Sequence, residues 1–213
     1  LAWKLAWRIR GLAGDALLDS YSVERVAAAR ENLRYASKGA EFMSPPSAPH
    51  RLMRDAVLSL SAQHPALTSL MSPRQHSAND YAGSPLNQAT ADEAGFASGP
   101  KPGMALPDGP LQRLAGGEAV AGHLTQLLGP WFNLLHFAAD HGPSAALAAS
   151  IQALGADVPI RLRTVAAAGT PAADGIDAID STGRLHALYG AGAGACYLVR
   201  PDGHLLARWG RVP

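Results

Sequence analysis

Residues 131–137, WFNLLHF, form a short apolar run that is typical of a buried strand. The alanine-rich segment that follows, residues 143–154, begins with a proline and predicts a helix. Residues 160–165, IRLRTV, alternate in polarity as a second strand does. A strand, a helix and a second strand in this order predict a crossover connection, and therefore parallel pairing of the two strands.

The C-terminal part of the sequence extends this pattern. Residues 182–189 predict a short helix closed by Gly190, and residues 195–200 and 204–209 predict two strands. The sequence Pro201-Asp202-Gly203 between them favours a tight hairpin. The order β-α-β-α-β-β resembles an α/β thioredoxin-like fold that lacks its last helix, since the sequence ends just beyond the last predicted strand. We therefore expect part of one sheet face to be uncovered.

The N-terminal part predicts helices instead. Its first stretch, LAWKLAWRIRGL at residues 1–12, has apolar side chains at helical spacing and few polar ones, namely Lys4, Arg8 and Arg10. A helix this apolar is expected to be buried, with Trp3 and Trp7 as packing residues. No capping residue precedes it, so we expect the chain to be the C-terminal part of a longer protein.

Two further helices are predicted. Residues 19–42 predict a long helix with a buried face that contains Tyr21, Val26, Leu33 and Ala36. Residues 44–49 end it, because their prolines lack a backbone N–H and clash with the preceding turn. Residues 51–60 predict a third helix, with one side formed by Leu52, Met53, Ala56, Val57 and Leu60.

The composition changes between Pro65 and Pro110, where Ser, Pro, Gly, Asn and Ala replace the periodic pattern. A stretch of this length without regular structure is unusual inside one compact domain, which indicates a domain boundary. We predict three parts: a helical segment at residues 1–63, an extended connector at 64–110 and the thioredoxin-like domain at 111–213.

The overall composition narrows the function classes. The 213 residues are 47% hydrophobic and 16% charged, with a formal net charge of +1, so no long-range field favours nucleic acid or an anionic membrane. No apolar run approaches the roughly 20 residues that a membrane-spanning helix needs. A single cysteine, Cys196, excludes an internal disulfide framework and favours a reducing, cytoplasmic setting.

Thioredoxin chemistry is not expected. It needs a cysteine pair where the first strand meets the first helix, and residues 139–143 read ADHGP there. Thioredoxins also have a cis-proline before the next core strand, where this chain has Ala195 and Cys196. We predict that the domain is redox-inactive and that Cys196 is a small buried apolar residue.

Two other groups of residues have structural interpretations. Gly190, Gly192 and Gly194 follow a predicted helix and enter a strand, whereas a nucleotide-binding loop follows a strand and opens a helix. They therefore predict a connector. His136 and His141 lack the spacing of a zinc-binding helix and are interpreted as surface or hydrogen-bonded residues.

Ser22, Glu24 and Arg25 form a candidate cluster on the long helix. Ser22 and Glu24 point to different sides of that helix, so roles on the helix surface and in ion pairs explain them.

Several segments, in this order, resemble the class A FAD-dependent aromatic hydroxylases. Members related to 3-(3-hydroxyphenyl)propionate hydroxylase, phenol hydroxylase and the polyketide aromatic hydroxylases are the most similar. The first 37 residues resemble the end of their FAD-binding domain, and residues 188–210 the close of their thioredoxin-like domain. The other matching segments are EFMSPPS at 41–47, RLMRDAVLSL at 51–60, YAGSPLN at 81–87 and PGMALPDGPL at 102–111.

The resemblance implies a parent enzyme that uses FAD and NAD(P)H to hydroxylate an aromatic small molecule. It also implies that the flavin-binding motifs precede Leu1, so we assign no catalytic, cofactor-binding or metal-binding residue to this chain. The isolated chain is expected to hold no FAD and to be inactive. Neither nucleic acid nor a membrane is an expected partner, and a homodimer is left open. The alternative is a redox-inactive thioredoxin-like interaction or dimerisation module.

Overall fold

The computed structural model describes residues 1–71, 79–89, 96–115 and 118–210. Contacts divide the chain into two compact units, Leu1–Tyr21 with Asp80–Pro213, and Ser22–Asn79. The first helix is therefore grouped with the sheet in this structure. The domain boundaries at 1–63, 64–110 and 111–213 stay a prediction for the longer protein.

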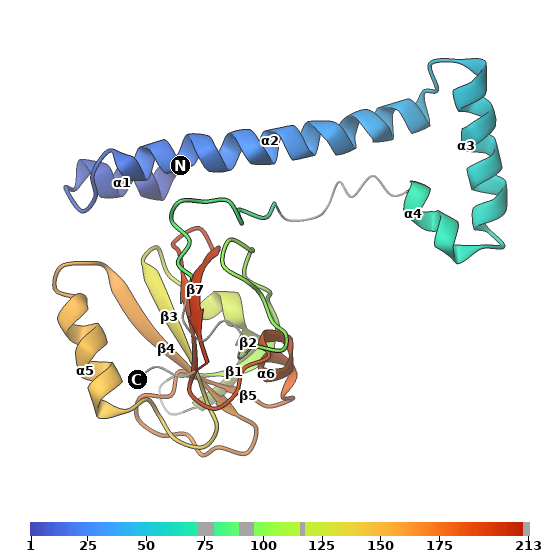
Figure 1. Cartoon of the computed structure of the whole chain (residues 1–213). Helices are drawn as coiled ribbons and strands as arrows, with labels where there is room; N and C mark the ends of the chain where they lie inside the picture. The colour runs from blue at the N-terminus through green and yellow to red at the C-terminus, as the bar shows by residue number, and fades with distance from the viewer. Residues whose placement is uncertain (72–78, 90–95, 116–117, 211–213) are drawn as a thin grey trace. The chain divides into compact units, whose positions relative to one another are not determined.

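Four neighbouring strands form one side of the sheet in the first unit (Figure 1). They are β3 (Phe132–Ala138), β4 (Ile160–Ala167), β6 (Ala195–Val199) and β7 (Leu205–Trp209). Strand β4 is parallel to β3, β6 is antiparallel to β3 on its other side, and β7 is antiparallel to β6. The resulting order β4-β3-β6-β7 confirms the thioredoxin-like fold that the sequence predicted.

Three strands were not predicted. They are β1 (Pro110–Ala115), β2 (Glu118–His123) and β5 (Ala178–Asp180), and they extend the sheet beyond β4 in the order β2-β1-β5. Strand β5 is too short to show alternation. Most side chains of the antiparallel β1–β2 pair are exposed, so this pair has little apolar pattern to detect.

Two helices lie on opposite faces of this sheet (Figure 1). Helix α5 (Ala145–Leu154) begins where the Ser144 hydroxyl accepts the Leu147 N–H at 3.1 Å. Helix α6 (Arg184–Tyr189) ends at Gly190. The core between α6 and the sheet consists of apolar residues that include Leu111, Leu124, Leu135, Phe137, Val165, Leu185, Tyr189, Tyr197 and Leu205.

Helix α1 (Ala2–Ile9) packs on this sheet with an unexpected face. Trp7 is buried against Phe132, and their rings meet edge-on with centroids 4.9 Å apart. Lys4, one of the few polar residues of this helix, is buried together with Trp7. The outward face is apolar, with side chains that are 52%, 40% and 82% exposed at Leu1, Leu5 and Ile9. The predicted burial of this helix is therefore correct only for its Trp3, Lys4 and Trp7 side.

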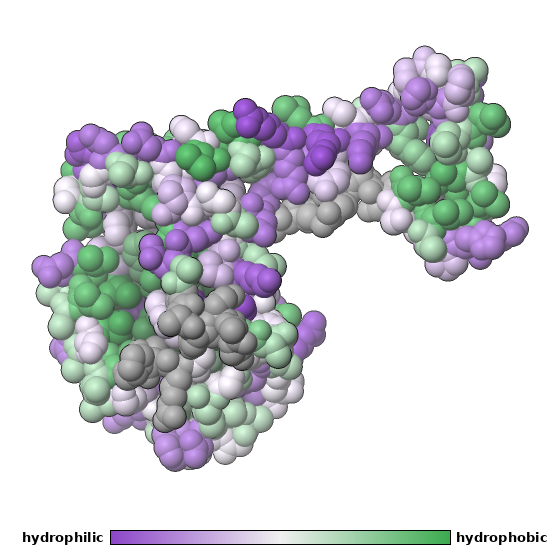
Figure 2. Space-filling view, in the orientation of Figure 1, coloured by the Kyte–Doolittle hydropathy of each residue, from purple (hydrophilic) through white to green (hydrophobic). Residues whose placement is uncertain are grey.

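The other helices are α2 (Ala16–Met43), α3 (Ala48–Ser61) and α4 (Thr68–Met71), with a 3₁₀ turn at Pro65–Leu67. The limits of α2 and α3 agree with the predicted helices and with the proline break, whereas α4 and the 3₁₀ turn lie in the segment that was predicted to be an extended connector. The buried face predicted for the long helix was wrong, however, because Val26 and Leu33 are exposed. Among the hydrophobic residues described in Ser22–Asn79, only Ala28 and Val57 are buried. Figure 2 shows the exposed apolar residues gathered over α3, which include Leu52 and Met53.

The part of the connector that the structure describes in the first unit is not a free linker, because Gln88 and Gly103 bind to β7. The Gln88 N–H donates to the Leu206 carbonyl at 2.9 Å, and the Gly103 N–H donates to the Leu205 carbonyl at 2.8 Å. These bonds satisfy backbone groups at the edge of the sheet, which would otherwise be open to pairing with another chain. No helix in the described residues is long and apolar enough to cross a membrane.

Leu135 provides a test of this core, because its side chain is fully buried in the central strand. We expect Leu135→Ala to lower the free energy of unfolding by about 2–5 kcal/mol, through lost burial and the cavity left behind. The matched control is Leu154→Ala on α5, where the side chain is 53% exposed and the loss should be below about 0.5 kcal/mol. Urea unfolding followed by circular dichroism measures both, and equal losses would contradict the assignment of the core.

Candidate functional site

The loop after β3 is the place where a thioredoxin carries its chemistry. Here it contains Ala139, Asp140, His141, Gly142 and Pro143, and it has no thiol. Asp140 and His141 are exposed, with Oδ2 and Nε2 3.3 Å apart. This loop cannot form or break a disulfide.

A carboxylate–imidazole pair fastens α6 to the sheet near the same loop. Asp180 is fully buried at the end of β5 and accepts the backbone N–H of His186 at 2.9 Å. The His186 Nδ1 lies 3.0 Å from the same carboxylate oxygen, and its Nε2 lies 3.4 Å from the carbonyl of Ala138. Both ring nitrogens thus face oxygen atoms of the protein, so the pair holds the structure together rather than presenting a base to a substrate.

Cys196 is buried on β6, as the sequence predicted. Burial raises the pKa of its thiol to about 12, so the reactive thiolate is nearly absent at neutral pH. No peptide bond in the described residues is cis, including the one before Cys196. Both redox features of a thioredoxin are therefore replaced here by unreactive groups.

The glycines before β6 have a structural role. Gly190 ends α6 with a φ of 56°, and a Cβ atom at this position would lie 2.5 Å from the Ser98 hydroxyl oxygen. The Gly194 N–H donates to the Phe137 carbonyl at 2.8 Å. These contacts tie the segment between α6 and β6 to Ser98 and to β3, which agrees with the predicted connector.

The two histidines considered for metal binding lie in different surroundings. His136 is buried in β3, where desolvation lowers the pKa of its imidazole, while His141 is exposed. Within the described residues, no group of three or more His, Cys, Asp or Glu side chains could hold a metal ion. In the candidate cluster of Ser22, Glu24 and Arg25 on α2, Ser22 and Arg25 are exposed while Glu24 is buried. Ser22 and Glu24 therefore point to different sides of the helix, as predicted.

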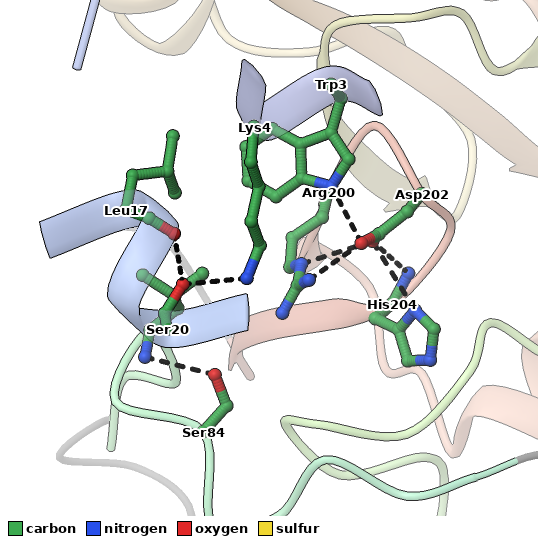
Figure 3. A network of polar contacts seen from close by, with 9 residues as sticks. Trp3, Lys4, Leu17, Ser20, Ser84, Arg200, Asp202 and His204 are labelled. Atoms are coloured by element: carbon green, nitrogen blue, oxygen red, sulfur yellow. Dashed lines mark hydrogen bonds and ion pairs between the residues drawn. The ribbon is translucent and has the colours of Figure 1, made fainter. Parts of the chain in front are cut away.

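A cluster that the sequence did not predict joins α1 to the β6–β7 hairpin (Figure 3). Asp202, in the hairpin turn, accepts the Trp3 indole N–H at 2.8 Å. The same carboxylate accepts two bonds from Arg200, from Nε at 3.1 Å and from Nη2 at 2.7 Å. His204 Nδ1 lies 3.4 Å from it. We call Trp3, Arg200, Asp202 and His204 the Asp202 cluster.

Arg200 is the buried member of this cluster. Its side chain has no exposed surface, whereas that of Asp202 keeps 28% of its exposure. The guanidinium lies over two aromatic rings, 5.4 Å from the Trp3 centroid and 5.8 Å from the Tyr81 centroid. Tyr81 also stacks on His204, with 4.3 Å between their centroids. The connector, the hairpin and α1 therefore meet around one cation.

A second polar contact holds α1 next to this cluster. The Lys4 ammonium donates to the Ser20 hydroxyl at 2.7 Å, and this hydroxyl donates to the Leu17 carbonyl at 2.6 Å (Figure 3). Lys4 also lies 5.7 Å from the Trp3 ring centroid. These bonds compensate for the burial of the Lys4 ammonium, because an unpaired buried charge is strongly disfavoured.

The charge state of Asp202 follows from its neighbours. Partial burial by itself would raise the pKa of this carboxyl group. Hydrogen bonds from His204 and Arg200, the positive charge of Arg200 and the Trp3 indole outweigh that effect and hold the pKa well below its usual range. Asp202 is therefore ionised at neutral pH, as its pairing with Arg200 requires.

Comparisons with known proteins agree with the fold and with the sequence resemblance. No family model matches the chain. Over 215 aligned residues, the chain is 31% identical to 6-methylpretetramide 4-monooxygenase from Streptomyces rimosus; the match covers 98% of this chain and 36% of that protein. Over 58 residues it is 40% identical to 3-(3-hydroxy-phenyl)propionate/3-hydroxycinnamic acid hydroxylase 1 from Burkholderia vietnamiensis, which covers 27% of this chain and 9% of that protein.

Two solved structures match the chain along nearly its whole length. Aklavinone-11 hydroxylase, in a ternary complex with FAD and aklavinone, aligns with a TM-score of 0.61 and 26% identity, over 100% of this chain and 35% of that chain. The flavin-dependent monooxygenase PieE, in complex with FAD and substrate, aligns with a TM-score of 0.61 and 22% identity, over 99% of this chain and 40% of that chain, and supports the fold alone.

The fold defines the class first: a sheet with thioredoxin-like topology, preceded by helices and without a cysteine pair. The comparisons then confirm the more specific resemblance, because the chain is similar along its whole length to the C-terminal region of FAD-dependent aromatic hydroxylases. The chain spans about a third of the length of the two relatives that it matches from end to end.

Cys196 supplies a test of redox inactivity. A thiol that is buried and has a raised pKa should not react with a disulfide reagent such as Ellman's reagent in the native chain at pH 8. In denaturant, the same reagent should titrate one thiol per chain. Rapid labelling of the native chain, or turnover in an insulin-reduction assay, would contradict this interpretation.

Asp202 gives a second test, through the pH dependence of stability. Because the folded-state pKa lies below the usual value of about 4, the unfolded chain binds more protons between these two values. The stabilisation is therefore complete above about pH 4 and is lost as the pH falls below it. We expect the difference in unfolding free energy between the wild type and Asp202→Asn to shrink on acidification from about pH 5 to 3. A difference that stays constant over this range would refute the assigned ionisation.

Proposed function

We propose that this chain is the C-terminal part of an FAD-dependent, NAD(P)H-using monooxygenase that hydroxylates an aromatic small molecule. The observation that carries the proposal is the match to 6-methylpretetramide 4-monooxygenase, which extends over 98% of the chain but over only 36% of that protein. A similarity of this extent is expected of one portion of such an enzyme.

The described residues do not fit a flavin site. A pyrophosphate site needs a glycine-rich loop that opens a helix, where free N–H groups bind the phosphates. The glycines at 190–194 instead follow α6 and enter β6. In this proposal, FAD and the aromatic substrate bind to another part of the longer protein, and the isolated chain is inactive.

The thioredoxin-like sheet then has a supporting role. Its equivalents of the redox positions are the thiol-free loop after β3 and the buried Cys196, and the nearby Asp180–His186 pair has a structural role. We propose that the sheet stabilises the enzyme or a contact between its subunits, in the cytoplasm. The alternative, an interaction module without enzymatic activity, makes the same use of this sheet but predicts no flavin.

The first experiment is to measure the intact mass and the absorbance spectrum of the protein purified from its native source. We expect a mass well above 22.1 kDa and a flavin band near about 450 nm, because flavin is the chromophore on which the proposed reaction depends. A colourless, folded and monodisperse species of 22.1 kDa would exclude the hydroxylase and favour the interaction module.

A further inference from the structure

Helix α1 differs from an ordinary surface helix in the placement of its polar groups. Its inner face contains an ammonium group and an indole N–H, from Lys4 and Trp3, and both have specific acceptors in Ser20 and Asp202. Its outer face contains the exposed apolar residues Leu1, Leu5 and Ile9. Directional polar bonds on the inner face fix how the helix is rotated on the sheet, which apolar contacts alone do not do.

The bonds that fix the helix converge on one residue. Asp202 is the acceptor for the Trp3 indole and is also the counterion of the fully buried Arg200. The Arg200 guanidinium in turn lies against the Trp3 ring. Removing the carboxylate charge would therefore leave a buried cation without its counterion directly beneath α1, and the helix would lose its bond to the hairpin at the same time.

We infer that Asp202 is a positioning residue, which fixes α1 on the thioredoxin-like sheet so that the apolar outer face of α1 is held in place for the remainder of the FAD-binding domain of the longer enzyme. This inference rests on the proposed function for the identity of that partner. About two thirds of the length of the relatives lies outside the region that matches this chain, which is enough for a domain that could cover this face. The exposed Leu1, Leu5 and Ile9 at four-residue spacing supply a surface of the right chemistry.

Asp202→Asn tests the anchor on the 213-residue chain, because it keeps the shape of the side chain and removes its charge. We expect the amides of α1 to exchange with solvent roughly ten-fold to a hundred-fold faster, while those of β3 change little. The matched control is Asp15→Asn. It breaks another Arg–Asp pair of α1, but Arg8 and Asp15 are 46% and 76% exposed, so α1 exchange should change less than about three-fold.

Trp3→Phe is a second variant, in case Asp202→Asn unfolds the chain. It keeps an aromatic ring against Trp7 and Phe132 and removes the indole donor together with the five-membered ring. Faster exchange confined to α1 supports the anchor. Unchanged exchange of the α1 amides in Trp3→Phe would overturn the anchor. An equal rise in α1 and β3 in both variants would also overturn it, since a contact that only stabilises the fold affects the whole sheet.

In the longer flavoprotein, the same variants test the effect on the cofactor. We expect Asp202→Asn to weaken FAD binding about ten-fold, measured from the band near about 450 nm during titration with FAD, and Asp15→Asn to leave it unchanged. Equal FAD affinity in wild type and Asp202→Asn overturns the link to the flavin-binding part. A longer protein in which even the wild type binds no flavin overturns the proposed function instead, and the exchange data on α1 still decide the anchor.

Discussion

The buried guanidinium of Arg200 constrains the arrangement of its surroundings more than any apolar contact near it. A cation without exposed surface needs a counterion and polarisable neighbours, and three segments distant in sequence supply them. The hairpin turn supplies Asp202, α1 supplies the Trp3 ring and the connector supplies Tyr81. An apolar interface tolerates small shifts, whereas this one requires all three segments at fixed distances. The course of the connector along β7 and the docking of α1 follow from the same requirement.

The four thioredoxin-like strands were predictable because each has a recognisable sequence pattern. An apolar run predicted β3, alternating polarity predicted β4, and the Pro201-Asp202-Gly203 turn lies between the predicted β6 and β7. Strands β1 and β2 were missed because most of their side chains are exposed. Without a buried face, their sequences do not alternate between apolar and polar residues. The helices α2 and α3 were found with nearly correct limits, since proline and spacing determine these. The burial of α2 was misjudged because periodicity shows where a helix could pack and not whether its partner is part of the chain.

The Asp202 cluster could not be predicted for a different reason. Pro201, Asp202 and Gly203 have turn chemistry that fully explains their presence, so no residue remained without a local role. Trp3 lies 199 positions away from Asp202, and only the tertiary structure brings the indole to the turn. Lys4 was recognised only as one of the few polar residues of its helix, and lysine is rarely buried. The sequence contained one weak indication that Lys4 is buried. When a helix has apolar residues on all sides, its few polar residues do not form a separate exposed face.

The short length of α1 explains why this helix needs such an anchor. Eight residues form about two turns, and isolated helices of that length are unstable in water. Its apolar outer face does not help here, because Leu1, Leu5 and Ile9 are exposed in this structure. The helix therefore depends on its inner face, where Trp7 packs on Phe132 while Trp3 and Lys4 form directional bonds. A helix held by one face alone leaves the other free to bind an apolar partner, which is what a segment shared between two parts of an enzyme requires.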